Sequence, residues 1–207
     1  GSIVELIGSN GGRANIARWV ALIGAIASFL VTLPLFSGFD RLNGGMQFTE
    51  LASWIPALGL NYHLGVDGIS VLLVILNAFT TVLVVLAGWQ VIQKKPAQYF
   101  AAFLIMSGLI NGAFSALDAI LFYAFFEGML IPMYLIIGVW GGPRRVYASI
   151  KFFLYTLLGS LLMLVALIYL SRLTGGSFAI LDMQAIPPIA KSTQILIFIA
   201  FFLSFAV

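Results

Sequence analysis

Cysteine is absent from the 207 residues of this chain, and charged residues are scarce. Without cysteine the chain forms no disulfide bond and no thiolate-ligated metal site, which leaves its redox compartment open. Only 8% of the residues are Asp, Glu, Lys or Arg, whereas 62% are hydrophobic. Soluble domains carry about 25% charged residues. This composition excludes a soluble domain and identifies an integral membrane protein.

Several functional motifs are also missing. The sequence has no glycine-rich dinucleotide loop, no phosphate loop, no iron–sulfur cysteine set and no nucleophile-elbow serine. Its single histidine, His63, makes no metal site alone, and its basic residues are not interleaved with aromatics as in nucleic-acid-binding patches. We therefore expect this chain to bind no NADH, flavin, ATP, metal or nucleic acid. Any redox or ATP chemistry would come from partner subunits.

Long apolar runs dominate what is present. A helix rises about 1.5 Å per residue, so about 20 apolar residues cross a bilayer. The runs predict an all-α integral membrane fold: a polytopic helix bundle with about five full transmembrane helices plus one truncated helix. Residues 68–207 form the membrane domain. The expected spans are 18–36, 68–92, 98–117, 118–141 and 147–171, followed by a short apolar run that reaches Val207.

Polar segments separate these runs. Residues 1–17 form a polar N-terminal segment, and residues 37–67 form a long connection. Within that connection LNYHLGVD alternates in the way that a short strand on the membrane surface would. The chain begins with Gly1-Ser2, and its last run is too short to cross. We therefore expect a fragment of a longer polypeptide.

The charges in the connections predict an orientation. If the spans alternate, one side carries the cations Arg13, Arg18, Lys94, Lys95, Arg144, Arg145 and Lys151. Connections rich in Lys and Arg face the cytoplasm or the matrix. The 37–67 connection has more acids than bases and is expected to be an extracytoplasmic loop.

One carboxylate, Glu127, lies near the middle of the 118–141 span. An ionised acid at the bilayer centre costs about 3 kcal/mol even on lenient scales. Such a residue needs a partner, a water-filled cavity or a bound proton. We interpret Glu127 as a proton carrier. The alternative is a glutamate that only hydrogen-bonds another helix.

The neighbours of Glu127 support this interpretation. Pro132 has no N–H, so the carbonyl of Gly128 loses its helical donor, and a kink is expected there. At 100° per residue, Tyr123 and Tyr134 share the face of Glu127.

Polar stripes run along two other spans. One comprises Asp67, Ser70, Asn77 and Thr81; the other comprises Ser107, Asn111 and Ser115, beside Gly108-x-x-x-Gly112. Small and polar residues at this spacing are typical of packed membrane helices, and we favour packing. The alternative is a water path toward Glu127 that includes Tyr123, Tyr134, Asn77, Asn111 and Tyr155.

Three other charged residues are candidates for weaker roles. Asp67 and Asp118 each precede a predicted helix, so we interpret both as N-caps. Lys151 lies about one turn inside its span, with Tyr155 one turn further on. It either extends its ammonium to the interface or takes part in the proton path.

Three segments together resemble a known family: HLGVDGISVLL at 63–73, LFYAFFEGMLIPMYLIIGVWGG at 121–142, and YASIKFFLYTLLGSLLMLVALIYL at 147–170. The chain is similar to subunit M of proton-pumping NADH:quinone oxidoreductase, which is respiratory complex I; the mitochondrial counterpart is NADH dehydrogenase chain 4. The resemblance covers most of residues 54–207.

The resemblance implies an antiporter-like fold of two inverted repeats, each with a helix broken near the midplane. It implies a proton channel driven at long range by quinone reduction in other subunits. Glu127 matches the family's essential buried glutamate. The family's partner lysine follows a Phe-Ala-Val stretch, here Phe205-Ala206-Val207, so it lies past this sequence. The family's first helix would fall within residues 1–17.

The same resemblance implies partners and a location. The partners would be other membrane and peripheral subunits of complex I, including neighbouring antiporter-like subunits. Those subunits would hold the NADH, FMN, iron–sulfur clusters and quinone. The location would be the bacterial cytoplasmic membrane or the mitochondrial inner membrane. Two other functions remain open: a subunit of a multisubunit Na⁺/H⁺ antiporter, and a passive membrane scaffold.

Overall fold

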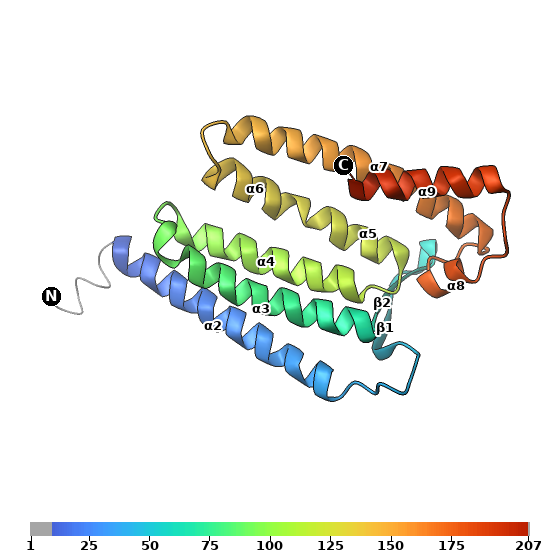
Figure 1. Cartoon of the computed structure of the whole chain (residues 1–207), viewed down its shortest axis with the longest axis horizontal. Helices are drawn as coiled ribbons and strands as arrows, with labels where there is room; N and C mark the ends of the chain where they lie inside the picture. Colours follow the sequence, from blue (N-terminus) through green and yellow to red (C-terminus); the bar gives the residue numbers. More distant parts are fainter. Residues whose placement is uncertain (1–9, 207) are drawn as a thin grey trace.

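The structure, a computed structural model, describes residues 10–206. It consists of a helical bundle with a small hairpin at one end (Figure 1). The elements are α2 (Asn10–Ser37), β1 (Gln47–Ile55), the 3-10 turn η1 (Pro56–Leu58), β2 (Leu60–Val66), α3 (Gly68–Val91), α4 (Pro96–Ser115), α5 (Ala119–Gly128), α6 (Leu130–Trp140), α7 (Arg145–Leu173), α8 (Ile180–Gln184) and α9 (Lys191–Ala206).

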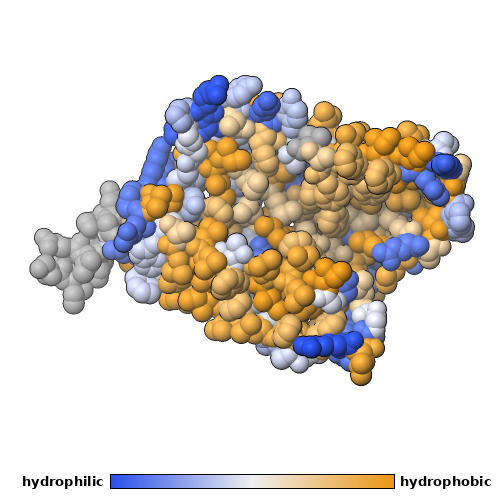
Figure 2. Space-filling model, in the orientation of Figure 1, coloured by the Kyte–Doolittle hydropathy of each residue, from blue (hydrophilic) through white to orange (hydrophobic). Residues whose placement is uncertain are grey.

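Within residues 10–206, five segments are long and apolar enough to cross a membrane: Ala14–Ser37 of α2, α3, α4, α5 together with α6, and α7. Helix α9 is apolar but shorter. Figure 2 shows apolar residues over the sides of the bundle and hydrophilic residues toward its ends. The predicted polytopic all-α membrane fold is therefore confirmed.

The N-terminal boundary differs from the expectation. Helix α2 begins at Asn10 rather than at residue 18, so the end of the expected polar segment 1–17 is helical. The family's first helix is expected to be lost or eroded within residues 1–17, and residues 1–9 of that range lie outside the described part of the chain. Polar residues such as Asn15 extend α2 beyond its apolar part, because the backbone hydrogen bonds of a helix form whether its side chains are polar or apolar.

The 37–67 connection contains two strands rather than one. β1 and β2 pair antiparallel, with Gln47 opposite Val66 and Ile55 opposite Leu60. The turn between them places Gly59 at φ 68°, a left-handed conformation that glycine adopts without strain. β1 was missed because its sequence, QFTELASWI, does not alternate cleanly between apolar and polar residues.

One end of the bundle, which we call the cation-rich end, carries Lys94 and Arg144. There the guanidinium of Arg18, which is 9% exposed, donates to the carbonyl of Ile92 (3.2 Å) and to Gln93 Oε1 (3.2 Å) at the end of α3. Trp140 Nε1 donates to the Lys94 carbonyl (2.6 Å). These bonds connect the N-terminal part of α2 and the last turn of α6 to the α3–α4 turn.

The opposite end, which we call the hairpin end, carries β1, β2, α8 and the α4–α5 link, residues 116–118 (Figure 1). Asp67 begins α3 there: its Oδ1 accepts the N–H groups of Ile69 (3.1 Å) and Ser70 (2.7 Å). The Ser70 N–H is the main reason that the pKa of Asp67 lies below its ordinary value of 3.8.

Candidate functional site

The helix that carries Glu127 starts from a buried cap. Asp118, 2% exposed, accepts the N–H groups of Ile120 (2.9 Å) and Leu121 (3.1 Å) and so begins α5. Capping satisfies donors that the first helical turn leaves without intrahelical partners. From Asp118 to Glu127 the helix rises roughly 13 Å, which takes Glu127 into the apolar layer.

This span is interrupted just after Glu127. α5 ends at Gly128, α6 begins at Leu130, and Met129 lies between them. Pro132 is buried in the first turn of α6 and has no N–H for the Gly128 carbonyl. The interruption therefore lies at the position where the lack of a donor for the Gly128 carbonyl predicts a kink.

The Glu127 carboxylate faces a mostly apolar interior. Glu127 is half-buried, and its Oε2 is buried without a hydrogen-bond partner within residues 10–206. Tyr123, one turn earlier on the same helix, is half-buried and packs against the cluster of Ala119, Met163 and Leu167. A carboxylate oxygen in such a place is stable when it holds a proton or meets a cation or water.

Two pairs of helices pack closely in this region. A Cβ on Gly112 of α4 would lie 2.7 Å from the Phe125 ring of α5. A Cβ on Gly159 of α7 would lie 3.3 Å from the Cα of Ser204 in α9. Glycine therefore permits both approaches, as small residues do in other membrane helices.

The end of α9 lies beside the glutamate's helix. The rings of Phe126 and Phe205 meet edge to face, with centroids 5.6 Å apart. Since Phe126 directly precedes Glu127, the last turn of α9 is next to the carboxylate-bearing turn of α5.

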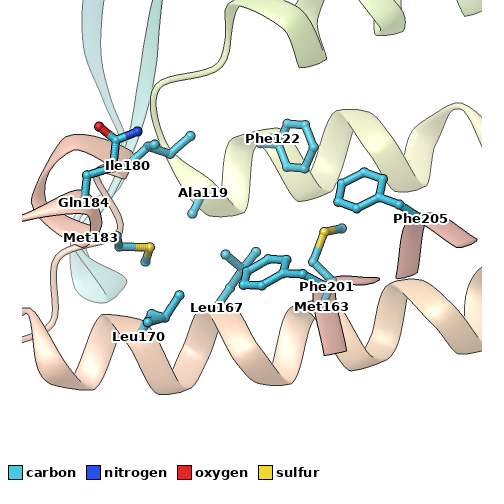
Figure 3. Close-up of a pocket in the computed structure, with 10 residues that line it drawn as sticks. All are labelled: Ala119, Phe122, Met163, Leu167, Leu170, Ile180, Met183, Gln184, Phe201 and Phe205. Atoms are coloured by element: carbon cyan, nitrogen blue, oxygen red, sulfur yellow. The ribbon is translucent and has the colours of Figure 1, made fainter. Parts of the chain in front are cut away.

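A cavity of about 350 Å³ extends from this contact toward the hairpin end, between α5, α7, α8 and α9 (Figure 3). Phe122 and Phe205 lie at one end of it, and Ile180 and Gln184 lie at the other. Apart from Gln184, the side chains that line it are apolar. The cavity therefore offers few groups that could recognise a polar ligand.

The polar stripes of α3 and α4 face one another. Asn77 Nδ2 donates to Asn111 Oδ1 (2.7 Å) and to the Ser107 carbonyl (2.9 Å), and Thr81 Oγ1 donates to Ser107 Oγ (2.8 Å). These bonds account for the side chains as interhelical packing. The Glu127-bearing helix contacts α4 through Gly112 and Phe125 instead.

The remaining predicted residues lie apart from the carboxylate. Tyr134 packs on Phe153 of α7, with ring centroids 5.7 Å apart. Lys151 is exposed on α7, and its Nζ lies 5.5 Å from the centre of the Tyr155 ring. Tyr123 lies one helical turn from Glu127, whereas Lys151 and Tyr155 lie on an exposed face of α7.

Ser160 is a fully buried polar residue that the sequence did not single out. It is 0% exposed and lies in α7, the helix that packs on α5. Its signal in the sequence was the pair Gly159-Ser160, two small residues inside an otherwise bulky apolar span. Within residues 10–206 no group of three or more His, Cys, Asp or Glu residues could hold a metal ion.

Comparison with known proteins agrees with this fold. Residues 17–114 match the family model "NADH-ubiquinone oxidoreductase chain 4, amino terminus", and residues 116–207 match "NADH:quinone oxidoreductase/Mrp antiporter, TM". The chain is 46% identical to NADH-quinone oxidoreductase subunit M of Rhodobacter capsulatus, over 97% of this chain and 41% of that protein. The chain thus spans about two fifths of the length of this relative.

Two solved structures share the fold. A chain of respiratory complex I from Thermus thermophilus with bound NADH superposes with a TM-score of 0.79 at 35% identity, over 91% of this chain and 39% of that one. A chain of the Mrp complex from Dietzia sp. DQ12-45-1b superposes with a TM-score of 0.80 over 92% of this chain and 21% of that one. At 15% identity this second likeness shows the fold alone.

The helical bundle and the two family models define an antiporter-like, multi-pass membrane protein. The two family models together extend over residues 17–207, and the named relatives are subunits of one enzyme. The chain belongs to the family of NADH-quinone oxidoreductase subunit M, the counterpart of NADH-ubiquinone oxidoreductase chain 4. The resemblance read from the sequence is therefore confirmed.

Proposed function

We propose that this chain is part of a proton-translocating membrane subunit of NADH:quinone oxidoreductase, and that Glu127 carries the proton. The observation that supports this most directly is the buried Oε2 of Glu127, which has no hydrogen-bond partner within residues 10–206. Leaving a buried carboxylate oxygen unsatisfied is costly. A site built to take up and release a proton accounts for that arrangement.

The mechanism follows from electrostatics. A buried carboxylate beside a buried ammonium stays ionised, and when the ammonium moves away, the carboxylate takes up a proton. The family resemblance implies such a lysine after a Phe-Ala-Val stretch like Phe205-Ala206-Val207. The contact between Phe126 and Phe205 brings the end of α9 beside Glu127, so a lysine there would be well placed.

In this proposal the Tyr123 hydroxyl is the next group after Glu127 to carry the proton. It lies one helical turn before Glu127 on α5, and a phenol both donates and accepts hydrogen bonds. We propose that the proton passes between α5 and α7 at this point. Lys151 and Tyr155, on the outer face of α7, would act only further along the path.

The chain's own residues supply no redox centre in this proposal. NADH, FMN, iron–sulfur clusters and quinone would belong to partner subunits of the complex. The membrane would be the bacterial cytoplasmic or the mitochondrial inner membrane, with the cation-rich end inside and the hairpin end outside.

The test is Glu127→Gln in the intact complex, reconstituted in vesicles. We expect fewer protons pumped per NADH oxidised, because the amide cannot take up and release a proton. Glu50→Gln, which makes the same chemical change on the exposed strand β1, serves as the control. A normal proton-to-NADH ratio in the Glu127 variant would show a scaffold role instead. Purification with small antiporter subunits in place of flavoproteins would identify a Na⁺/H⁺ antiporter.

A further inference from the structure

The short α4–α5 link is held from two sides. On one side it joins β2: Leu117 N–H donates to the His63 carbonyl (2.8 Å), and Leu64 and Ala116 form an antiparallel bridge. The first residue of the link thus extends the hairpin sheet. The hairpin is thereby connected through backbone hydrogen bonds to the segment that leads into α5.

On its other side the link joins the loop between α7 and α8. Ala119 N–H donates to the Phe178 carbonyl (2.8 Å), and Ile180 N–H donates to the Leu117 carbonyl (2.9 Å). Asp118 and Ala179 form a second antiparallel bridge. Three segments distant in sequence therefore lie side by side in the order β2, link and 178–180.

Asp118 is at the centre of this arrangement. Its Oδ1 caps α5, while its Oδ2 accepts the backbone N–H of Asn61 in β2 (3.4 Å). The same carboxylate therefore serves α5 and the hairpin at once. Asp67 provides a contrast, because among the described residues its carboxylate accepts only from Ile69 and Ser70 of the helix that it caps.

We propose that Asp118 is a positioning residue for Glu127. By tying the start of α5 to the hairpin and to the 178–180 loop, it fixes where the glutamate stands relative to α7 and α9. Displacement of the hairpin would then move α5 as well. The consequence for proton transfer rests on the proposed function, whereas the mechanical link does not.

The variant Asp118→Asn separates the two contacts of this side chain. An asparagine keeps one oxygen for the cap of α5 but presents an NH₂ group to the Asn61 N–H, so that two donors face each other. Asp67→Asn is the matched control, since it keeps its cap and has no second contact to lose. Asp118→Thr also caps the helix but has no second side-chain oxygen to accept the Asn61 N–H. It replaces Asp118→Asn if the asparagine variant fails to assemble.

The first measurement is amide hydrogen exchange in the intact complex. We expect Asp118→Asn to raise exchange by about fivefold or more in all three segments, 60–64, 116–121 and 178–180, because they open together. The Asp67 control should leave them unchanged. Exchange that rises only in the first turn of α5, or not at all, overturns the proposal.

The second measurement is the pH midpoint of the Glu127 carboxyl band in infrared difference spectra. We expect Asp118→Asn to shift that midpoint, and Asp67→Asn to leave it where it is. An unshifted midpoint with altered exchange shows a purely structural tie and overturns the positioning role. Normal pumping by Glu127→Gln would refute the proposed function while leaving both of these measurements valid.

Discussion

Gly112 of α4 lies directly against the Phe125 ring of α5, so close that an added Cβ would meet the ring at 2.7 Å. Gly108, one turn earlier in the same Gly-x-x-x-Gly motif, has nothing within 4 Å of its Cβ position. Only one of the two glycines therefore permits the close approach of α5 to α4.

We predict that Gly112→Ala destabilises the subunit by roughly 1–3 kcal/mol, because the ring must shift inside a packed interface. Gly108→Ala should be neutral or slightly stabilising, since alanine favours helix. Thermal unfolding of the purified complex in detergent measures both variants. Equal effects of the two substitutions would contradict this assignment.

The hydrogen bonds between α3 and α4 lead to a second prediction. Ser107→Ala removes the hydroxyl that accepts from both Asn77 and Thr81. We expect a loss of stability of about 1 kcal/mol, the scale of interhelical bonds in membranes, and an unchanged number of protons per NADH. Ser115→Ala on the same helix is the control. Lost pumping at normal stability would favour the water-path interpretation of Asn77 and Asn111.

Arg18 supports a third prediction. Its guanidinium holds Asn15, Ile92 and Gln93 through a planar set of donors. We expect Arg18→Lys to retain only part of these hydrogen bonds, because a lysine offers a single point charge and cannot reach three acceptors in one plane. Protease accessibility of the α3–α4 turn should then increase in Arg18→Lys, and more so in Arg18→Met.

Asp67 supports a prediction about pH. Since backbone N–H groups, first that of Ser70, lower its pKa in the folded state, the charged form contributes stability above the unfolded value of 3.8. That contribution is lost as the pH falls through the folded pKa. Asp67→Ala should therefore cost about 1 kcal/mol near neutral pH, and the difference from wild type should shrink below pH 3.8. The free energies of unfolding of wild type and Asp67→Ala, measured at pH 7 and at pH 3, test this prediction.

Much of the bundle could be predicted because hydropathy acts locally. The expected spans 68–92 and 98–117 lie close to the observed α3 and α4. Glu127 could also be singled out, since one acid in a long apolar run is conspicuous whatever surrounds it. Asp118 could be expected to cap α5 from its position alone.

The sheet at the hairpin end could not be predicted in this way. The bonds of Leu117 to His63 and of Ile180 to Leu117 join residues far apart in sequence, and backbone donors carry no side-chain signature. The contact of Asp118 with Asn61 and the burial of Ser160 depend on the same tertiary packing. The start of α2 was misplaced because helices can extend past their apolar part.

The order in which the α4–α5 link finds its partners also bears on biogenesis. β2 is made before the link, whereas residues 178–180 follow only after α5, α6 and α7. At about 5–20 residues per second, a ribosome needs several seconds to cover that interval. During this time α5 is tethered on one side only, so an acid enters the lipid before the fold has fixed its surroundings. We therefore expect the carboxyl group of Glu127 to enter the membrane before residues 178–180 can hold the start of α5.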